Sequence, residues 1–458
     1  MAKTEITRLR DFPSVEELLQ APSLRREIAS LPRPVAAEIV KQTVASFKTR
    51  LKGQAAGITV EELHGALRTR LTQAKRREIR RVINASGIIV HTNLGRAPLS
   101  EELFDAVKET VLGYGNVEFD LDRGARGERG SACESYLATL SGAEAATVVN
   151  NCAAALFIIL NTLANRRKVI ISRGELVQIG GGFRIPDILK RSGAALVEVG
   201  TTNITTVSDY EAAAAAGAAM ILKVHKSNFI QAGFTQEVPL KELIGLGRKF
   251  ELPVVNDLGS GVFIPTRDVL GYAEPTVQQS VRAGADLTCF SGDKMLGGMQ
   301  AGLIVGRADL IARVKKNPIF RTVRVDKVVF AVLERLLAIY LNGTHCSDIK
   351  LWSLLSVPVG ELKKRAAAVL ARLGNPDGVT VRETPAFMGG GALPESEIPS
   401  VGLEFSNKYD PGMLMSRLRA GDPPIVGRVE KDRFLLDLKA VDVQDLDVLI
   451  SAIRQVIT

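Results

Sequence analysis

The sequence predicts an α/β protein with a mainly parallel sheet, preceded by a helical region and followed by a smaller α+β region. Short apolar segments alternate with helical segments from about residue 142 to residue 306. Repeated strand–helix–strand units of this kind form a parallel sheet covered by helices. Polar residues follow several of the apolar segments, and ligands bind beyond the carboxyl ends of parallel strands. We therefore expect a ligand site at that end of the sheet.

Composition places the chain among ordinary globular proteins. Its 458 residues are 46% hydrophobic and 24% charged, and no apolar run is long enough to cross a membrane. The first residues form no apolar signal region, so a cytoplasmic location is expected. The four cysteines form no Cys-x-x-Cys pair and there are four histidines, so neither a metal site nor a disulfide framework is predicted. Cys152 and Cys289 lie in apolar runs, which favours inert core cysteines over nucleophiles.

The first 81 residues predict a separate helical region. Ser14 with Glu17 is typical of a helix start, and further helices are expected over 35–51 and from Thr59 to about Arg81. The later half of the last helix carries seven basic residues: Arg68, Arg70, Lys75, Arg76, Arg77, Arg80 and Arg81. Such a run is either a solvated face or a contact with nucleic acid. The net charge of +9 suggests a polyanionic partner.

Two stretches in the first half of the chain have the features of anion sites. One apolar run ends in His91, Asn93 and Arg96, which form either a polar turn or a loop that presents donors to an anion. A second apolar strand passes through Asn151 and Cys152 directly into an apolar helix. The start of such a helix offers free N–H groups and a favourable dipole, which suits a phosphate.

Lys294 is the residue around which the chemistry is predicted. It lies in Phe290-Ser291-Gly292-Asp293-Lys294, a tight turn between two apolar strands. A buried lysine loses its proton readily and can form a Schiff base with an aldehyde. A Ser-x-x-Lys turn followed by glycines is typical of pyridoxal-phosphate (PLP) enzymes, with the serine toward the phosphate and the lysine toward the aldehyde. The alternative is a turn lysine without chemistry, because one lysine beside glycines is a weak signal.

Asp257 supports the PLP interpretation. It ends a buried strand, where an unpaired carboxylate is costly. PLP needs an anion opposite its pyridine nitrogen, and a strand-end aspartate about one helix and one strand before the lysine meets that need. The alternative is an N-cap before a short turn. Asn151, Thr201 and His225 also lie at strand ends or just past them.

The last third of the chain predicts an arginine pair and a second domain. Arg321 and Arg324 are three residues apart, so they either close on one oxyanion or lie on a helix surface. The apolar stretch 328–341 predicts a long helix that links domains, and a smaller α+β domain follows it. The predicted domains are a helical N-terminal domain (1–81), a PLP-binding large α/β domain (82–341) and a small α+β domain (342–458).

The strand-end residues and the lysine turn together resemble fold type I, aspartate aminotransferase-like PLP enzymes. A set of motifs over nearly the whole chain is similar, more closely, to the bacterial L-seryl-tRNA(Sec) selenium transferases, or selenocysteine synthases. These motifs are Asn84–Gly87, His91–Leu99, Ser172–Leu176, Glu198–Asn203, Asp257–Gly261 and Phe290–Lys294. The set is specific, although no single motif is.

This resemblance implies a reaction and assigns residues to it. L-seryl-tRNA(Sec) is converted to L-selenocysteinyl-tRNA(Sec) through an aminoacrylyl intermediate, with selenophosphate as selenium donor. Lys294 and Asp293 are expected to be catalytic, Lys294 as cofactor ligand and then base. The expected PLP-binding residues are Lys294, Asp257, Asn151, Cys152, Ser291 and His225, and the expected substrate-binding residues are Arg96, Arg321, Arg324 and His91.

The resemblance also implies that residues 1–81 hold the tRNA and that the chain forms a homodecamer, a pentamer of dimers. Two positions depart from the pattern: Ile204 stands where a basic residue is expected, and Cys133 stands close before Glu134 where a histidine is expected. A phosphate- or cofactor-binding role at these two positions is therefore questioned, but neither changes the Lys294–Asp257 pair.

Two alternatives remain beside this reaction. One is a related PLP lyase that acts on a small amino acid or amino sugar phosphate, and the basic N-terminal region argues against it. The other is a tRNA-binding protein without catalysis, and the presence of both Lys294 and Asp257 argues against that.

Overall fold

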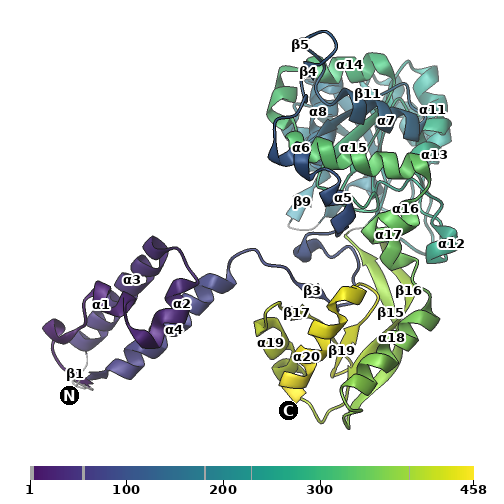
Figure 1. Cartoon of the computed structure of the whole chain (residues 1–458). Helices are drawn as coiled ribbons and strands as arrows, with labels where there is room; N and C mark the ends of the chain where they lie inside the picture. The colour runs from purple at the N-terminus through teal and green to yellow at the C-terminus, as the bar shows by residue number, and fades with distance from the viewer. Residues whose placement is uncertain (1–4, 54–56, 180–181, 228, 391, 458) are drawn as a thin grey trace. The chain divides into compact units, whose positions relative to one another are not determined.

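The computed structural model describes residues 5–53, 57–179, 182–227, 229–390 and 392–457. The chain separates into two compact units, Met1–Arg81 and Val82–Thr458 (Figure 1). The sequence-predicted boundary after residue 341 lies inside the second unit, and the three-domain division stays a prediction. Among the described residues, no helix combines the length and the apolar character that a membrane span requires.

The first unit is a small bundle of helices around its own core. Its helices are α1 (Val15–Leu19), α2 (Arg25–Ala29), α3 (Arg33–Gly53) and α4 (Val60–Arg76). The capping box of Ser14 and Glu17 at the start of α1 is confirmed. Leu63, Leu67 and Leu71 lie on one face of α4 and are fully buried. The expected extension of this helix to Arg81 is wrong, because Leu71 is its last core leucine and the helix ends at Arg76.

The second unit is built on a seven-stranded sheet in the order β10-β7-β11-β12-β13-β14-β6. The strands are β6 (Ala145–Val149), β7 (Lys168–Ser172), β10 (Ala195–Val199), β11 (Met220–Val224), β12 (Val254–Gly259), β13 (Leu287–Ser291) and β14 (Gly302–Gly306). Only β14 runs antiparallel to its neighbours β13 and β6. The mainly parallel sheet is confirmed.

Helices cover both faces of this sheet. One face packs against α8 (Cys152–Ala164), α9 (Ile185–Arg191) and α14 (Ala308–Lys316). The other packs against α7 (Ser131–Ser141), α10 (Val207–Ala215), α11 (Leu240–Lys249), α13 (Val277–Ala283) and α15 (Lys327–Asn342). Because both faces are covered, the strands are mainly apolar, with polar residues such as Asp257 of β12 towards their carboxyl ends. The carboxyl ends of the parallel strands are the part of the sheet left for polar residues.

The C-terminal part of this unit has a second sheet and core. Strands β15 (Val379–Gly389), β16 (Ala392–Phe405), β18 (Arg428–Glu430) and β19 (Arg433–Asp437) form an antiparallel sheet in the order β15-β16-β19-β18. Its helices are α18 (Val359–Arg372), α19 (Pro411–Ala420) and α20 (Leu446–Ile457). The Ile89 and Val90 amides donate to the carbonyls of Phe387 and Met388 in β15. The hairpin therefore positions the run that leads into His91.

Candidate active site

Lys294 lies in a buried turn just beyond β13, where its side chain is removed from solvent. The residue is 4% exposed. The turn is fixed by backbone hydrogen bonds from Met295 to the Ser260 carbonyl (3.0 Å) and from Ala97 to the Asp293 carbonyl (3.2 Å). Burial lowers the pKa of Lys294, because desolvation disfavours the ammonium form. The neutral, nucleophilic amine is thus more accessible here than at a surface lysine.

Asp257 lies within β12, beside the lysine turn. It pairs in register with Cys289 of β13 and with Val224 of β11. Burial raises the pKa of Asp257, and the charge of Lys294 opposes that shift. The alternative role as an N-cap is wrong, because the next helix begins only at Arg267.

Two cysteines surround this carboxylate. The Cys152 thiol donates to Asp257 Oδ1 across 3.6 Å. The ligand atoms of Cys152, Asp257 and Cys289 all lie within 4.8 Å of one another. The neighbouring Cys152 and burial raise the pKa of the Cys289 thiol, so it keeps its proton, the form that is a poor metal ligand. Cys152 is only partly buried, and its thiol contacts Asp257 of the predicted site.

The turn from β6 into α8 forms the third part of the site. Asn151 is the N-cap of α8, and its side-chain oxygen accepts from the Ala154 amide (2.9 Å). A Cβ atom on Gly302 of β14 would collide with the Asn151 carbonyl, so this close approach requires glycine. Ser291 pairs with Gly302 and therefore lies near the same helix start. The first N–H groups of α8 have no intrahelical partners and face an anion favourably.

Three further residues, His225, Ser227 and Glu274, complete the site. No sequence motif predicted the last two. The His225 amide donates to the Asp257 carbonyl (2.8 Å), and its Nε2 lies 3.1 Å from Oε1 of the buried Glu274. Lys294 Nζ and Ser227 Oγ each lie 3.7 Å from the position that a Cβ on Gly259 would occupy. Glu274 and Ser227 were missed from the sequence, because neither belongs to a recognisable motif.

Arg96 precedes all strands of the large sheet in the sequence, and it contacts the lysine turn. One of its guanidinium nitrogens donates to both carboxylate oxygens of Asp293, at 2.9 and 2.8 Å. The Arg96 amide donates to the His91 carbonyl, and His91 Nδ1 accepts from the Asn93 amide. The structure thus brings the turn containing His91 and Arg96 next to Lys294, and it pairs Arg96 with the predicted catalytic acid.

The two later arginines are placed less directly. They belong to the segment around η6 (Pro318–Val323), where the Val323 carbonyl accepts from the Asn150 amide (2.9 Å). Arg324 lies 3.4 Å from Glu118, and Arg321 is exposed. Within the part of the chain that the structure describes, no hydrogen bond or ion pair joins either arginine to the Lys294 turn. The segment lies near the start of α8 because its Val323 carbonyl accepts from the Asn150 amide.

The fold and these strand-end residues define an aspartate aminotransferase-like, fold type I PLP-enzyme fold. A family model described as L-seryl-tRNA selenium transferase matches residues 82–442. The chain belongs to the L-seryl-tRNA selenium transferase family.

Relatives support this membership over the full length. The chain is 41% identical to an L-seryl-tRNA(Sec) selenium transferase of Geotalea daltonii, with 98% of this chain and 99% of that one covered. It is 44% identical to the protein of the same name from Aquifex aeolicus, over 83% and 85% of the two chains. The solved structure of a D-glucosaminate-6-phosphate ammonia-lyase aligns with a TM-score of 0.60 over 82% of this chain and 96% of that one. Its 19% identity makes it a likeness of fold alone.

Proposed function

We propose that this chain converts L-seryl-tRNA(Sec) to L-selenocysteinyl-tRNA(Sec) with pyridoxal 5′-phosphate as cofactor and selenophosphate as selenium donor. The observation that carries the proposal is the buried Lys294–Asp257 pair in a chain whose full-length relatives have the transferase name. The net reaction replaces the serine hydroxyl by a selenol, and the donor's phosphorus leaves as inorganic phosphate with the oxygen that the serine loses. We further propose that the protein works in the cytoplasm, and its cofractionation with tRNA in the soluble fraction of a cell lysate tests this location.

The residues present fit PLP. A buried lysine with a lowered pKa, a buried carboxylate and the start of α8 lie together at strand ends. They match the aldehyde, the pyridine nitrogen and the phosphate of PLP. When bound, PLP supplies an electron sink for the carbon beside an amino group. In our assignment, Asp257 would hold the pyridine nitrogen, supported by Cys152 and His225, while Asn151 and Ser291 would shape the phosphate site.

The remaining residues have roles in proton transfer and anion binding. Lys294 would take the proton from the α-carbon of the seryl group, because its pKa is lowered and its amine is buried. Asp293 would orient groups beside it while paired with Arg96. We assign Arg96, Arg321, Arg324 and His91 to selenophosphate. The three arginines are chosen because guanidinium groups bind oxyanions in a bidentate manner, and His91 because it lies in the same turn as Arg96.

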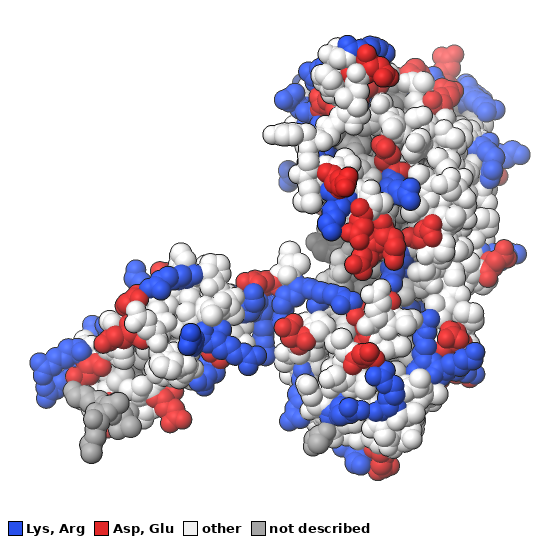
Figure 2. Space-filling model, in the orientation of Figure 1, with Lys and Arg blue, Asp and Glu red and all other residues white. Residues whose placement is uncertain are grey.

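The first unit supplies the positive charge that an RNA substrate requires. Residues 1–81 contain seventeen basic and nine acidic residues, a net +8 of the chain's +9. Figure 2 shows lysines and arginines spread over the visible face of this unit. Arg76 and Arg77, at the end of α4, are exposed. This concentration of charge favours tRNA binding over the small-molecule lyase alternative.

The double change Arg76→Glu, Arg77→Glu is expected to weaken binding of seryl-tRNA(Sec) by about tenfold or more, because each lost phosphate contact weakens binding and reduces its salt dependence. The wild-type protein with PLP and selenophosphate should form selenocysteinyl-tRNA and should bind serine tRNA less tightly. Binding is checked by measuring tRNA affinity at several salt concentrations. Product formation is checked by measuring selenium transfer to the tRNA.

A matched charge change in the second unit provides the control. Lys190→Glu, Arg191→Glu alters exposed residues at the end of α9. We expect the control to retain tRNA affinity and both variants to retain cofactor absorbance. Equal affinity for tRNA in wild type and the α4 variant would contradict an RNA-holding role for this helix. Absence of selenium transfer by the wild type would contradict the function.

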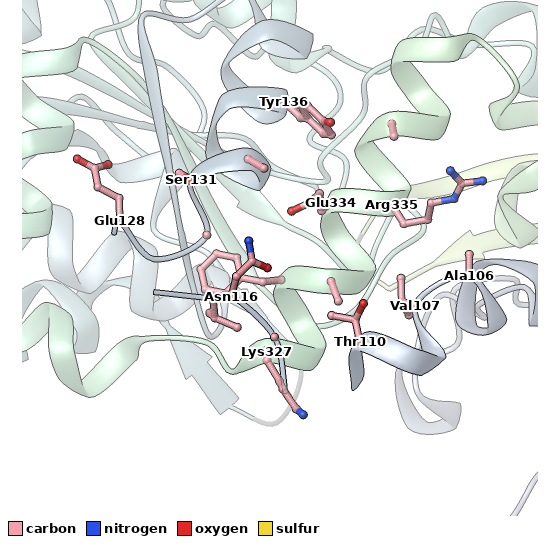
Figure 3. A pocket seen from close by; sticks show the side chains of 17 residues that line it. Ala106, Val107, Thr110, Asn116, Glu128, Ser131, Tyr136, Lys327, Glu334 and Arg335 are labelled. Carbon is pink, nitrogen blue, oxygen red and sulfur yellow. The ribbon is translucent and has the colours of Figure 1, made fainter. Parts of the chain in front are cut away.

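An exposed apolar face supports homo-oligomer formation. Phe104, Leu112, Tyr114, Leu121 and Tyr136 are exposed and lie within 33 residues of sequence. They belong to or flank α5 (Glu101–Asp105), α6 (Lys108–Leu112) and α7. A cavity of about 410 Å³ opens between α6, α7 and α15 (Figure 3). Helices α5, α6 and α7 all pack against α15, and a monomer rarely exposes so many large apolar side chains on neighbouring elements.

We propose that a second copy of the chain covers this face, and that five such dimers form a decamer. Leu112→Asp with Tyr114→Asp should therefore lower the mass measured by light scattering from a multiple of 49.3 kDa toward that single value. The wild-type mass divided by 49.3 kDa gives the number of chains and distinguishes a dimer from a decamer. A wild-type mass equal to one chain would contradict the assembly.

A further inference from the structure

Glu274 is a buried carboxylate beside the active site. Its side chain is 2% exposed, and its Oε1 lies 3.1 Å from Nε2 of His225. Among the described residues, His225 is the only side chain that bonds to this carboxylate. We propose that Glu274 is a positioning residue, which holds the His225 ring with a proton on Nε2 and so makes Nδ1 a proton donor to the departing hydroxyl. The inference rests on the proposed function, because it assigns a proton carrier for that reaction.

Stability alone does not explain why Glu274 is buried. A buried carboxylate is costly unless it is paired, and a buried pair is often no more stable than apolar side chains of the same volume. Glu175, which is as deeply buried, is bound both by Lys223 (3.1 Å) and by the Val224 amide (2.9 Å). Glu274 has a histidine instead, the side chain whose proton is exchanged near neutral pH. The pair therefore fits a role in proton transfer better than a role in folding.

The backbone around Glu274 holds the carboxylate in place. The Glu274 amide donates to Thr266 Oγ1 (2.9 Å), and this hydroxyl donates to the Tyr272 carbonyl (2.8 Å). Two residues after Glu274, Thr276 is the N-cap of α13 and forms a capping box with Gln279. The carboxylate thus projects from a loop that is anchored on both sides. An anchored partner of this kind can fix the orientation of an imidazole ring.

The pairing also determines which ring nitrogen carries the proton. A carboxylate only accepts hydrogen bonds, so the ring donates from Nε2. In the described part of the chain, Nδ1 of His225 has no hydrogen-bond partner. The residue lines a hollow of about 320 Å³, and its side chain is 28% exposed. Nδ1 is therefore the open nitrogen of the ring, able to take up a second proton and to release it.

His225 lies close to the predicted base. It directly follows β11, and its amide donates to the Asp257 carbonyl (2.8 Å). The Ser227 amide donates to the His225 carbonyl, and Ser227 Oγ and Lys294 Nζ each lie 3.7 Å from the position of a Cβ on Gly259. The proposed reaction moves protons at two atoms of the seryl group, the α-carbon and the oxygen that leaves. Two proton carriers that lie near each other can serve these two atoms separately.

The proton balance of this step is simple. Lys294 takes the proton from the α-carbon. As the bond between the β-carbon and the hydroxyl oxygen breaks, the oxygen takes the proton from Nδ1 of the doubly protonated His225 ring and leaves as water. The ring keeps its proton on Nε2, where Glu274 holds it.

Nuclear magnetic resonance of the cofactor-free, full-length protein tests the place of the proton. The chain has four histidines, so protein labelled with ¹⁵N-histidine gives four pairs of ring signals, and His225→Gln identifies one pair by its loss. At a pH that makes the rings neutral, His225 of the wild type should carry its proton on Nε2. Glu274→Gln should move part of the protein to the Nδ1 tautomer, because an amide can also donate to Nε2.

Kinetics of the holoenzyme test the role in the reaction. Glu274→Gln should lower kcat with seryl-tRNA(Sec) by roughly 100-fold and leave KM unchanged. The same tRNA carrying β-chloroalanine should restore most of the rate, because chloride leaves without a proton. Glu134→Gln is the matched control, since it alters a buried glutamate that binds Thr147 and Lys315. It should change neither the His225 tautomer nor kcat.

The outcomes separate this role from a structural one and from the proposed function. Cofactor absorbance shows whether the variants are folded, and the wild-type spectrum gives the tautomer even where the Glu274 variant is not. A His225 proton on Nδ1 in the wild type, or unchanged tautomer and kcat in Glu274→Gln, overturns the proposal and leaves the proposed function standing. An equal loss of kcat with both substrates also overturns it. Absence of selenium transfer by the wild type contradicts the proposed function and this role together.

Discussion

Lys294→Ala is expected to abolish the long-wavelength absorbance of the lysine-bound cofactor and to reduce turnover by about 10⁴-fold or more. Lys294 combines burial, a lowered pKa and a position within reach of Gly259 and Ser227. The substitution removes both the group that holds the cofactor's aldehyde and the base that takes the substrate proton. Absorbance spectra of purified protein with added PLP and single-turnover assays measure the two losses separately.

Lys439 provides a matched control for this experiment. It is also buried, and burial lowers its pKa to about 8, but its amine donates to the Val357 carbonyl in the C-terminal part. Lys439→Ala should reduce thermal stability and leave the cofactor absorbance in place. If Lys294→Ala kept the absorbance, or if Lys439→Ala removed it, the cofactor assignment would be wrong. The comparison also shows that a lowered lysine pKa alone does not identify an active site.

The sheet could be predicted from sequence because its strands are short, apolar and separated by helices. The strand ends at Asn151, His225, Asp257 and Lys294 followed from the same alternation. Local pattern fixes where each strand stops, and the parallel arrangement places those stops at one end of the sheet. This part of the candidate site therefore needed no knowledge of distant contacts.

Contacts between segments far apart in sequence could not be predicted in this way. The Arg96–Asp293 pair spans 197 residues, and the bond from Cys152 to Asp257 spans 105. Arg96 carried a signal for anion binding, but nothing in its surroundings indicated which carboxylate it would pair with. Glu274 lies in a loop, and only the folded chain brings it to His225. Such pairs depend on how helices pack between strands rather than on residue spacing.

Asp257→Asn is expected to have opposite effects on catalysis and on the stability of the cofactor-free protein. Turnover should fall by about 10²- to 10³-fold, because the variant removes a preorganised charge from the reacting system. The free energy of unfolding without cofactor should stay equal or rise at neutral pH. Burial raises the pKa of Asp257, so its ionised form is less favourable in the folded chain than in the unfolded chain.

The sign of this effect can be checked by changing pH. A group with a raised folded pKa binds its proton more tightly in the folded state, so stability falls as pH rises between its ordinary and its raised pKa. Denaturant unfolding of the cofactor-free wild type should show that fall, and Asp257→Asn should reduce it. Cofactor titration, followed by absorbance, should show weaker PLP binding in the variant.

Asp437 separates this prediction from a general effect of removing a buried carboxylate. It is also buried with a raised pKa, but Ser400 and Arg428 bind its side chain. Asp437→Asn should lower stability, because it weakens a satisfied hydrogen-bond network and removes one of the two carboxylates that pair with Arg428. It should leave PLP affinity unchanged. If Asp257→Asn destabilised the cofactor-free protein as much as Asp437→Asn, or retained full turnover, then Asp257 would be a structural carboxylate rather than the partner of the cofactor.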